Sequence, residues 1–245
     1  MNRPTLLITG VSSGVGLSLA RHLAGRYRVV GVARKLDVAR AALAGVDHLE
    51  LIAADLARPD EVEACLDRVI DQVGAPSHVI NNAGVNLPGR IDELGPGDLA
   101  TSLQVNCLAP VAIMRRLLPH MADAGFGRIV NLTSGAPLNC FPGYAAYSAS
   151  KAALNAATVT AAREHQEGNV RINLMSPGPV RSNMAPNASM DPAVCHATVD
   201  YLLHPDPATP TGRFFWLGYE IPLFPGLEGI RWLDGVASDR FRRIL

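Results

Sequence analysis

Tyr147 and Lys151 are the two residues whose types and spacing could do chemistry together. They lie four positions apart in a helix-forming stretch, so a helix would place both side chains on one face, one turn apart. The chain has five tyrosines and only two lysines, so chance alone would produce this spacing roughly 0.04 times. The alternative is a half-buried tyrosine beside a lysine that extends its amine to solvent.

A phenol beside a fixed positive charge can exchange protons at neutral pH. The pKa of a free tyrosine is about 10, which makes it a poor proton shuttle. An ammonium about 4 Å from the hydroxyl favours the phenolate by about 4 kcal/mol at an effective dielectric constant of roughly 20. That energy lowers the pKa by about 3. We therefore expect Lys151 to stay charged and to bring the pKa of Tyr147 near neutrality.

A glycine-rich loop between a strand and a helix indicates a phosphate site near the N-terminus. Residues 5–9 form a short apolar run typical of a buried parallel strand, and residues 17–24 have helical periodicity. Gly10, Gly14 and Gly16 would let the intervening backbone approach a pyrophosphate, which the helix N-terminus stabilises. The spacing differs from the Gly-x-Gly-x-x-Gly fingerprint of dinucleotide folds, and a tight strand-to-helix turn is the alternative.

Two cations follow the expected second strand, residues 28–33. In a dinucleotide fold an acidic side chain at the end of this strand binds the ribose 2′-hydroxyl. This chain has Arg34 and Lys35 there and no acid, and a guanidinium can bind a 2′-phosphate through two hydrogen bonds. The sequence therefore predicts NADP(H), with NAD(H) as the alternative if these cations are simply solvated.

Strands continue to alternate with helices along most of the chain. Asn106 lies in the middle of a long expected helix, where an isolated asparagine is more often a solvated surface residue. Further strands are expected at residues 49–53, 77–80, 127–133, 170–175 and 213–218, and helices at 61–73, 97–121, 145–162 and 193–203, before an irregular tail from 221. The pattern predicts an α/β fold, a single-domain doubly wound parallel sheet of about seven strands flanked by helices, Rossmann-like. Residues 1–182 would hold the cofactor and catalytic core, and residues 183–245 the substrate-side loops, last strand and tail.

Composition argues against several other classes of protein. The 22 basic and 22 acidic residues balance, so no basic surface for nucleic acid or membrane is expected. The four cysteines are scattered without clustered histidines, which predicts neither a metal site nor a disulfide framework. No signal stretch or membrane span is visible. We expect a soluble, cytoplasmic protein.

Taken together, the chain resembles the short-chain dehydrogenase/reductase family over about residues 5–182. The glycine loop looks like the family's cofactor loop, and residues 82–84 look like its Asn-Ala-Gly element. The family's catalytic tetrad is matched in order by Asn106, Ser134, Tyr147 and Lys151. The interval of thirteen between the serine and the tyrosine selects Tyr147 over Tyr144.

The resemblance implies a cofactor site formed by loops at one edge of the sheet. Asp55 would meet the adenine, and residues 177–180 the nicotinamide carboxamide. Ser13 stands where many NADP-dependent members carry a cation, and the last third of the chain lacks a familiar family ending. The expected cofactor contacts are Gly10, Ser12, Ser13, Gly14, Val15, Gly16, Arg34, Lys35, Asp55, Leu56, Asn82, Ala83, Gly84, Tyr147, Lys151, Pro177, Gly178, Val180 and Ser182.

The activity implied is reversible hydride transfer between a nicotinamide and a carbonyl or secondary alcohol. Tyr147 would give its proton to the carbonyl oxygen, and Ser134 would hydrogen-bond that oxygen. Lys151 would lower the pKa of the tyrosine and bind the nicotinamide ribose, and Asn106 would hold a water that connects Lys151 to solvent.

The substrate is expected to be a small, mostly apolar molecule. Its expected contacts are Ser134, Leu138, Tyr144, Tyr147 and Met184, although apolar residues in surface loops are also ordinary packing. Two other functions stay open, a dehydratase or epimerase with bound cofactor and a non-catalytic dinucleotide sensor. The complete Asn/Ser/Tyr/Lys set argues against the sensor. Family resemblance also implies a homodimer or homotetramer packed through the helices around Asn106 and Tyr147.

Overall fold

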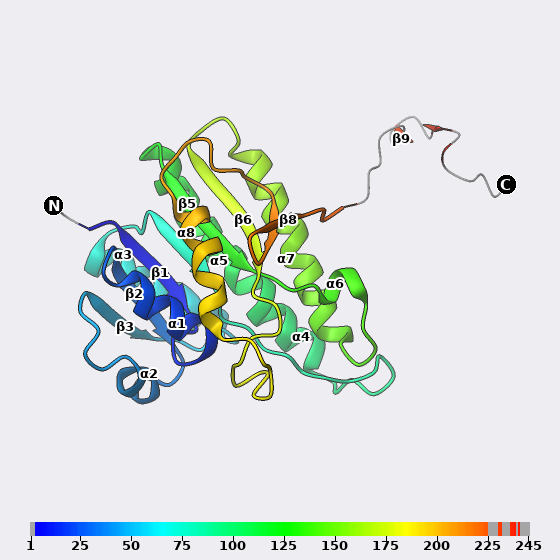
Figure 1. Cartoon of the computed structure of the whole chain (residues 1–245), viewed down its shortest axis with the longest axis horizontal. Helices are drawn as coiled ribbons and strands as arrows, with labels where there is room; N and C mark the ends of the chain where they lie inside the picture. The colour runs from blue at the N-terminus through cyan, green and yellow to red at the C-terminus, as the bar shows by residue number, and fades with distance from the viewer. Residues whose placement is uncertain (1–2, 225–229, 232–235, 239, 241–245) are drawn as a thin grey trace.

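The computed structural model describes residues 3–224, 230–231, 236–238 and 240 (Figure 1). Its centre is an eight-stranded sheet in the order β3-β2-β1-β4-β5-β6-β7-β8. All neighbours pair in parallel except β7 and β8, which are antiparallel. The strands are β1 (Thr5–Thr9), β2 (Arg28–Ala33), β3 (Leu49–Ala53), β4 (His78–Asn81), β5 (Gly127–Leu132), β6 (Val170–Ser176), β7 (Phe214–Trp216) and β8 (Tyr219–Ile221).

Helices cover both faces of this sheet (Figure 1). They are α1 (Gly14–Leu23), α2 (Leu36–Ala42), α3 (Pro59–Val73), α4 (Asp98–Leu103), α5 (Ala109–Asp123), α6 (Ala136–Asn139), α7 (Ala145–Glu164) and α8 (His196–Leu203). One buried cluster joins the sheet to α1, α2 and α8, and the other joins it to α3, α5 and α7. The predicted doubly wound α/β fold is confirmed.

Burial on both faces explains the continuous apolar strands. In β1, Leu6 and Ile8 pack in the α1 cluster while Leu7 packs in the α5 cluster. Because successive strand residues point to opposite faces, both sets of positions in a central strand are covered, which favours apolar residues at most of them. The short runs that the sequence analysis used as strand signals have this cause.

The carboxyl-terminal end of the sheet differs from the prediction. The expected last strand at residues 213–218 ends at Trp216, and Leu217 (φ 47°) and Gly218 (φ 82°) reverse the chain into β8. Two successive left-handed residues form the tight turn that suits a β-hairpin. The sheet therefore has eight strands instead of about seven, and the tail expected from residue 221 begins inside β8. Beyond it, β9 (Ile230–Arg231) pairs with β10 (Val236–Ala237), and most other tail residues lie outside the described ones.

The helix expected at residues 97–121 is three elements. α4 ends at Leu103, a π-helical segment spans Gln104–Leu108, and α5 continues from Ala109. Asn106 lies in the π segment and is completely buried, so the solvated surface position considered for it is wrong.

Arg128 closes the opposite, amino-terminal edge of the sheet. Its guanidinium is fully buried and makes five hydrogen bonds, to Gly127, Asn169, His204 and Asp206. It also lies 4.4 Å from the centroid of the Phe126 ring. Burial lowers its pKa to about 10, which still leaves it charged at neutral pH. Within the described part of the chain, no helix is long and apolar enough to cross a membrane.

Candidate active site

The expected catalytic residues meet at the carboxyl-terminal edge of the sheet. Ser134 lies two residues beyond the end of β5, and Tyr147 and Lys151 lie one turn apart near the start of α7, which packs on β6. The carboxyl edge is where open α/β sheets bind ligands.

Lys151 is a buried cation with one firm partner. Its side chain is only 4% exposed, and Nζ donates a 2.7 Å hydrogen bond to the Leu132 carbonyl at the end of β5. A Cβ added to Gly84 would lie 3.7 Å from Nζ, so the amine sits against the backbone of the Asn-Ala-Gly element. Burial lowers the pKa of Lys151 to about 8, and the nearby Cys107 thiol opposes this effect. The amine is therefore still mostly protonated at pH 7.

Tyr147 has a raised pKa. Burial of the phenol disfavours the phenolate and raises the pKa above 10, while a side-chain hydrogen bond from Ser134 lowers it. The Lys151 ammonium lies over the Tyr147 ring, 5.9 Å from its centroid, and is bound to the Leu132 carbonyl. The prediction that Lys151 brings this pKa near neutrality is wrong for this geometry, because desolvation outweighs a cation placed over the ring. Tyr147 is a protonated phenol at neutral pH.

Ser134 is held with its proton free to donate. Its Oγ accepts a 3.1 Å hydrogen bond from the N–H of Ala136, in the first turn of α6. That contact directs the hydroxyl proton away from α6, and the hydroxyl hydrogen-bonds the Tyr147 side chain. A ligand oxygen placed between them could accept from both hydroxyls.

Asn106 ties three segments of the site together. Its Oδ1 accepts from the N–H of Val85 at 2.8 Å, and its Nδ2 donates to the Val85 carbonyl at 2.8 Å and to Ser150 Oγ at 2.9 Å. Ser150 in turn donates to the Tyr147 carbonyl at 2.8 Å. The extra residue of the π segment is the kind of local distortion found at functional sites. The amide joins the β4–α4 loop to α7, and its expected role toward a water stays a prediction.

The three glycines of the first loop are required for close packing. A Cβ on Gly16 would lie 2.2 Å from the Gly10 carbonyl oxygen. Gly10 (φ 76°) and Gly14 (φ 55°) have left-handed backbones, and added Cβ atoms would lie 2.9 Å from Ala83 Cα and 2.8 Å from Ser182 Cβ. The loop therefore brings the Asn-Ala-Gly element and the segment after β6 to one place.

The N-terminus of α1 is open to an anion. No side chain caps it, its first turn has no acidic residue, and Ser13 at the cap position has extended backbone (φ −164°). The free N–H groups and the positive end of the helix dipole suit a pyrophosphate. The residues present therefore fit a dinucleotide.

Asn82 braces the glycine loop. Its Nδ2 donates to the carbonyls of Thr9 at 2.8 Å and Gly10 at 3.1 Å, while Thr9 Oγ1 accepts from the N–H groups of Asn82 and Ala83 at 3.0 Å each. The side-chain donors of Asn82 are thus already used, which suits a residue that positions the loop.

The two cations after β2 are exposed at the start of α2. Within the described ranges neither Arg34 nor Lys35 has an ion pair, whereas Arg28 at the other end of β2 pairs with Glu50. Both cations are therefore available to a ligand phosphate.

Asp55 shapes the turn after β3. Its Oδ1 accepts a 3.0 Å hydrogen bond from the N–H of Ala57, and its own N–H donates to Glu61 Oε2 at 2.8 Å. Leu56 is buried, and its carbonyl accepts from Gln104 Nε2 at 3.2 Å. These contacts place the carboxyl end of β3 beside the π segment.

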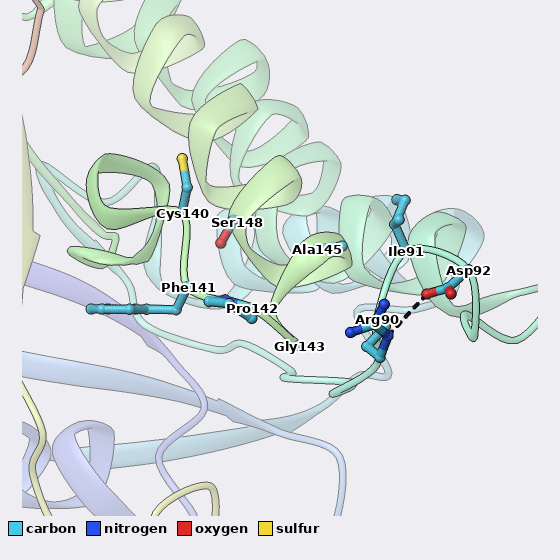
Figure 2. A pocket seen from close by; sticks show the side chains of 9 residues that line it. All are labelled: Arg90, Ile91, Asp92, Cys140, Phe141, Pro142, Gly143, Ala145 and Ser148. Atoms are coloured by element: carbon cyan, nitrogen blue, oxygen red, sulfur yellow. Dashed lines mark hydrogen bonds and ion pairs between the residues drawn. The ribbon is translucent and has the colours of Figure 1, made fainter.

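The expected substrate side contains a row of aromatic rings and a small cavity. The Tyr144 ring centroid lies 6.4 Å from that of Tyr147 and 6.5 Å from that of Phe141. The N–H of Gly89 donates to the Gly143 carbonyl at 2.9 Å, which joins the loop after β4 to the loop before α7. A cavity of about 310 Å³ lies beside this junction (Figure 2); it is lined by Arg90, Ile91, Asp92, Cys140, Phe141, Pro142, Gly143, Ala145 and Ser148.

This cavity flanks the catalytic residues and does not contain them. Ser148 lines it, whereas Tyr147 and Ser134 do not (Figure 2). Leu138 and Met184, two of the expected substrate contacts, are 43% and 46% exposed and line no part of it.

Gly178 shapes the segment after β6. Its neighbour Trp216 was not among the residues predicted from the sequence. Gly178 (φ 74°) donates its N–H to Ser176 Oγ at 3.3 Å, and its carbonyl accepts from the N–H of Val180 at 2.9 Å. The Trp216 indole packs on Gly178, at the end of β7. An apolar strand that ends in tryptophan at the ligand edge was the signal available in the sequence.

Comparison with known proteins places these features in one family. The family model for short chain dehydrogenases matches residues 4–193. Nodulation protein G of Rhizobium sp. (strain N33) is 32% identical over 182 residues, 73% of this chain and 74% of its own length. A 3-oxoacyl-[acyl-carrier-protein] reductase of Bos taurus is 32% identical over 180 residues, 72% of this chain and 76% of its own.

Solved structures agree with this placement. The crystal structure of a metagenomic short-chain oxidoreductase in complex with NADP is similar with a TM-score of 0.78 and 30% identity, over 88% of this chain and 97% of that one. The family model covers far more than half of the chain, and the two relatives each match over more than two thirds of it. This chain therefore belongs to the short-chain dehydrogenase family of oxidoreductases.

Proposed function

We propose that the protein is an NADP(H)-dependent oxidoreductase that moves a hydride between the nicotinamide and a carbonyl or secondary alcohol of a small, mostly apolar substrate. The observation that carries the proposal is that Ser134, Tyr147 and the buried Lys151 gather at the carboxyl-terminal edge of the sheet, where the uncapped α1 N-terminus also opens. Ser134 and Tyr147 present two hydroxyl donors for a carbonyl oxygen beside a place that suits a pyrophosphate.

Each residue has a distinct role when the enzyme reduces a carbonyl. When bound, the nicotinamide supplies the hydride. Tyr147, protonated at neutral pH, donates its proton to the carbonyl oxygen as general acid. Ser134 holds that oxygen beside the phenol. Lys151 keeps a positive charge near the tyrosine, which stabilises the phenolate left after proton transfer.

The preference for NADP(H) rests on charge at the end of β2. Arg34 and Lys35 are exposed and, among the described residues, have no ion-pair partner, so they are available for a 2′-phosphate. Similar structures are in complex with NADP and with NADH, so they support a nicotinamide dinucleotide, and the choice of NADP(H) rests on the two cations. Use of NAD(H) is the competing outcome, because Ser13 supplies no second cation at the glycine loop.

The remaining parts of the proposal concern organisation and setting. We propose one domain in which residues 1–182 bind cofactor and carry the chemistry, while residues 183–245 shape the substrate side. Exposed Ala149, Ala152 and Ala156 on α7 and Leu108 before α5 support a homodimer or homotetramer packed through these helices. The four free cysteines fit a reducing cytoplasmic location.

The test is reduction of a carbonyl panel with NADPH, followed by the near-ultraviolet absorbance of the reduced nicotinamide. Tyr147→Phe should abolish turnover and leave NADPH binding intact, because the ring remains and only the acidic hydroxyl is lost. Tyr201→Phe, at an exposed tyrosine of α8, is the control and should stay active. A Tyr147→Phe enzyme that keeps most of its kcat refutes the assignment. Conversion of substrate without net NADPH oxidation indicates a dehydratase or epimerase, and NADPH binding without any conversion indicates a sensor.

A further inference from the structure

Trp216 ends β7 at the ligand edge of the sheet. In register it lies opposite Ser176, the last residue of β6, from which the chain enters the loop at residues 177–180. Trp216 is 39% exposed, whereas the other two residues of the strand are buried.

Strand alternation places the indole on the face of the sheet that carries the catalytic helix. Phe214 packs in a cluster with Leu154 of α7, whereas Phe215 points to the other face, where its ring lies 6.0 Å from that of Tyr201 on α8. Trp216 is two residues beyond Phe214 and therefore shares its face. It lies on the same side as Tyr147 and Lys151.

The indole is in direct contact with Gly178. A Cβ built on Gly178 would lie 2.9 Å from Trp216 Nε1 and 3.8 Å from its Cδ1. A side chain at position 178 would displace the ring, and the φ of 74° independently favours glycine. The glycine at position 178 and its left-handed backbone thus leave room for the Trp216 ring.

Few other contacts hold this part of the loop. The Gly178 N–H reaches Ser176 Oγ only at 3.3 Å, and the 2.9 Å bond from Val180 closes a three-residue turn within the loop. Firm attachment begins later, where Arg181 donates its N–H to the Met190 carbonyl at 2.8 Å. Among the described residues, the indole is the side chain placed against Gly178 in this segment.

We propose that Trp216 is a positioning residue for the nicotinamide. Its indole holds residues 177–178 in place, and these in turn fix the orientation of the ring that delivers the hydride. This inference rests on the proposed function and on the expectation, implied by the family resemblance, that residues 177–180 meet the nicotinamide carboxamide. The adenosine and pyrophosphate sites at the glycine loop and α2 lie on other elements and do not depend on Trp216.

The test compares Trp216→Ala with Tyr219→Ala in the full chain. Tyr219 is directly opposite Trp216 in the hairpin and is 67% exposed, so its removal shows how much of any effect comes from disturbing the same turn. NADPH is titrated while the reduced nicotinamide is excited directly, and its fluorescence anisotropy and intensity in the bound state are recorded. Turnover is then measured at saturating NADPH with a carbonyl compound that the wild type reduces.

In Trp216→Ala we expect an NADPH Kd close to that of wild type and a bound-state anisotropy that falls toward that of free NADPH. We expect kcat to be about tenfold lower, since small misplacement of reacting groups has effects of this size. Tyr219→Ala should match wild type in all three. Trp216→Phe, which keeps an aromatic ring but loses the Nε1 contact, should be intermediate, and it replaces the alanine variant if that variant does not fold.

Unchanged anisotropy and kcat in the Trp216 variants overturn the inference, as do equal losses in Tyr219→Ala. Those results leave the proposed function standing, because the wild type would still bind and oxidise NADPH. A wild type that binds neither NADPH nor NADH overturns both.

Discussion

Replacing Lys151 by methionine should make the protein more stable at neutral pH while removing its activity. Methionine keeps the unbranched shape of the buried side chain but carries no charge. In the native chain, burial lowers the pKa of Lys151 from 10.5 to about 8. These values differ by about 2.5, and each unit corresponds to about 1.4 kcal/mol, so the buried ammonium costs about 3 kcal/mol of stability at pH 7.

The sign follows from proton binding in the two states. Between pH 8 and 10.5 the unfolded chain binds more protons at Lys151 than the folded chain does, so the stability of the wild type rises with pH in this window. Below pH 8 both states are protonated and the full cost is present. The methionine variant has no such group, so its advantage should be largest near pH 7 and should shrink by up to about 3 kcal/mol as the pH passes through this window.

One opposing effect limits the gain at pH 7. The variant leaves the Leu132 carbonyl without the 2.7 Å hydrogen bond from Nζ, which costs about 1–3 kcal/mol. This cost does not depend on pH. The change in the stability difference with pH is therefore a cleaner measure of the buried charge than the difference at one pH.

Urea unfolding at pH 7 and pH 9.5 of wild type, Lys151→Met and Lys35→Met measures this change. Lys35 is the chain's only other lysine and is exposed, so its variant should run parallel to the wild type. Groups that all three proteins share cancel in the comparison. Parallel stability curves for wild type and Lys151→Met would refute the reasoning, because they would show that the amine is not desolvated in the folded state.

Three further substitutions test the cofactor site and the frame that carries it. Arg34→Asp should lower the ratio of kcat/KM for NADPH over NADH by about 100-fold, because a charge-assisted contact becomes a repulsion. Steady-state kinetics with both cofactors measure this ratio. Arg40→Asp, on the exposed side of α2, should leave the ratio unchanged. Gly16→Ala should abolish NADPH binding in calorimetry, because its Cβ would lie 2.2 Å from a backbone oxygen. Gly25→Ala, whose Cβ would have no atom of the described residues within 4 Å, should bind normally. Arg128→Leu should lower the free energy of unfolding in urea by about 3 kcal/mol or more, because it leaves several buried acceptors unpaired. Turnover at low temperature should be retained, since Arg128 lies at the edge of the sheet opposite the catalytic residues.

The elements that bear local patterns were predictable from sequence. The strands β1, β2, β5 and β6 are apolar runs because both sheet faces are covered, and the glycine loop follows β1 because the chain must turn sharply into α1. The hairpin after β7 was not predictable. Its turn places a leucine at φ 47°, where glycine or asparagine would be the usual signal, and β8 has only three residues.

Asn106 shows why part of the site could not be predicted from local pattern. The apolar periodicity of residues 97–121 is compatible with one continuous helix, and an inserted π turn changes that periodicity little. What stabilises the insertion is tertiary, because the amide bonds Val85 and Ser150, which come from a loop and a helix far away in the chain. Only the resemblance to a family singled out this residue.

The Tyr147 and Lys151 pair separates two kinds of prediction. Spacing correctly placed both side chains on one face of α7, because helical geometry is local. Their electrostatics depend on burial and on the carbonyl of Leu132 from β5, which the spacing cannot reveal. The folded protein holds a neutral phenol above an ammonium whose own pKa has fallen to about 8. Such a pair is ready to give a proton at neutral pH and can take one back only after the phenol has ionised. The reducing direction should therefore run at neutral pH, and the oxidation of an alcohol should speed up as the pH rises.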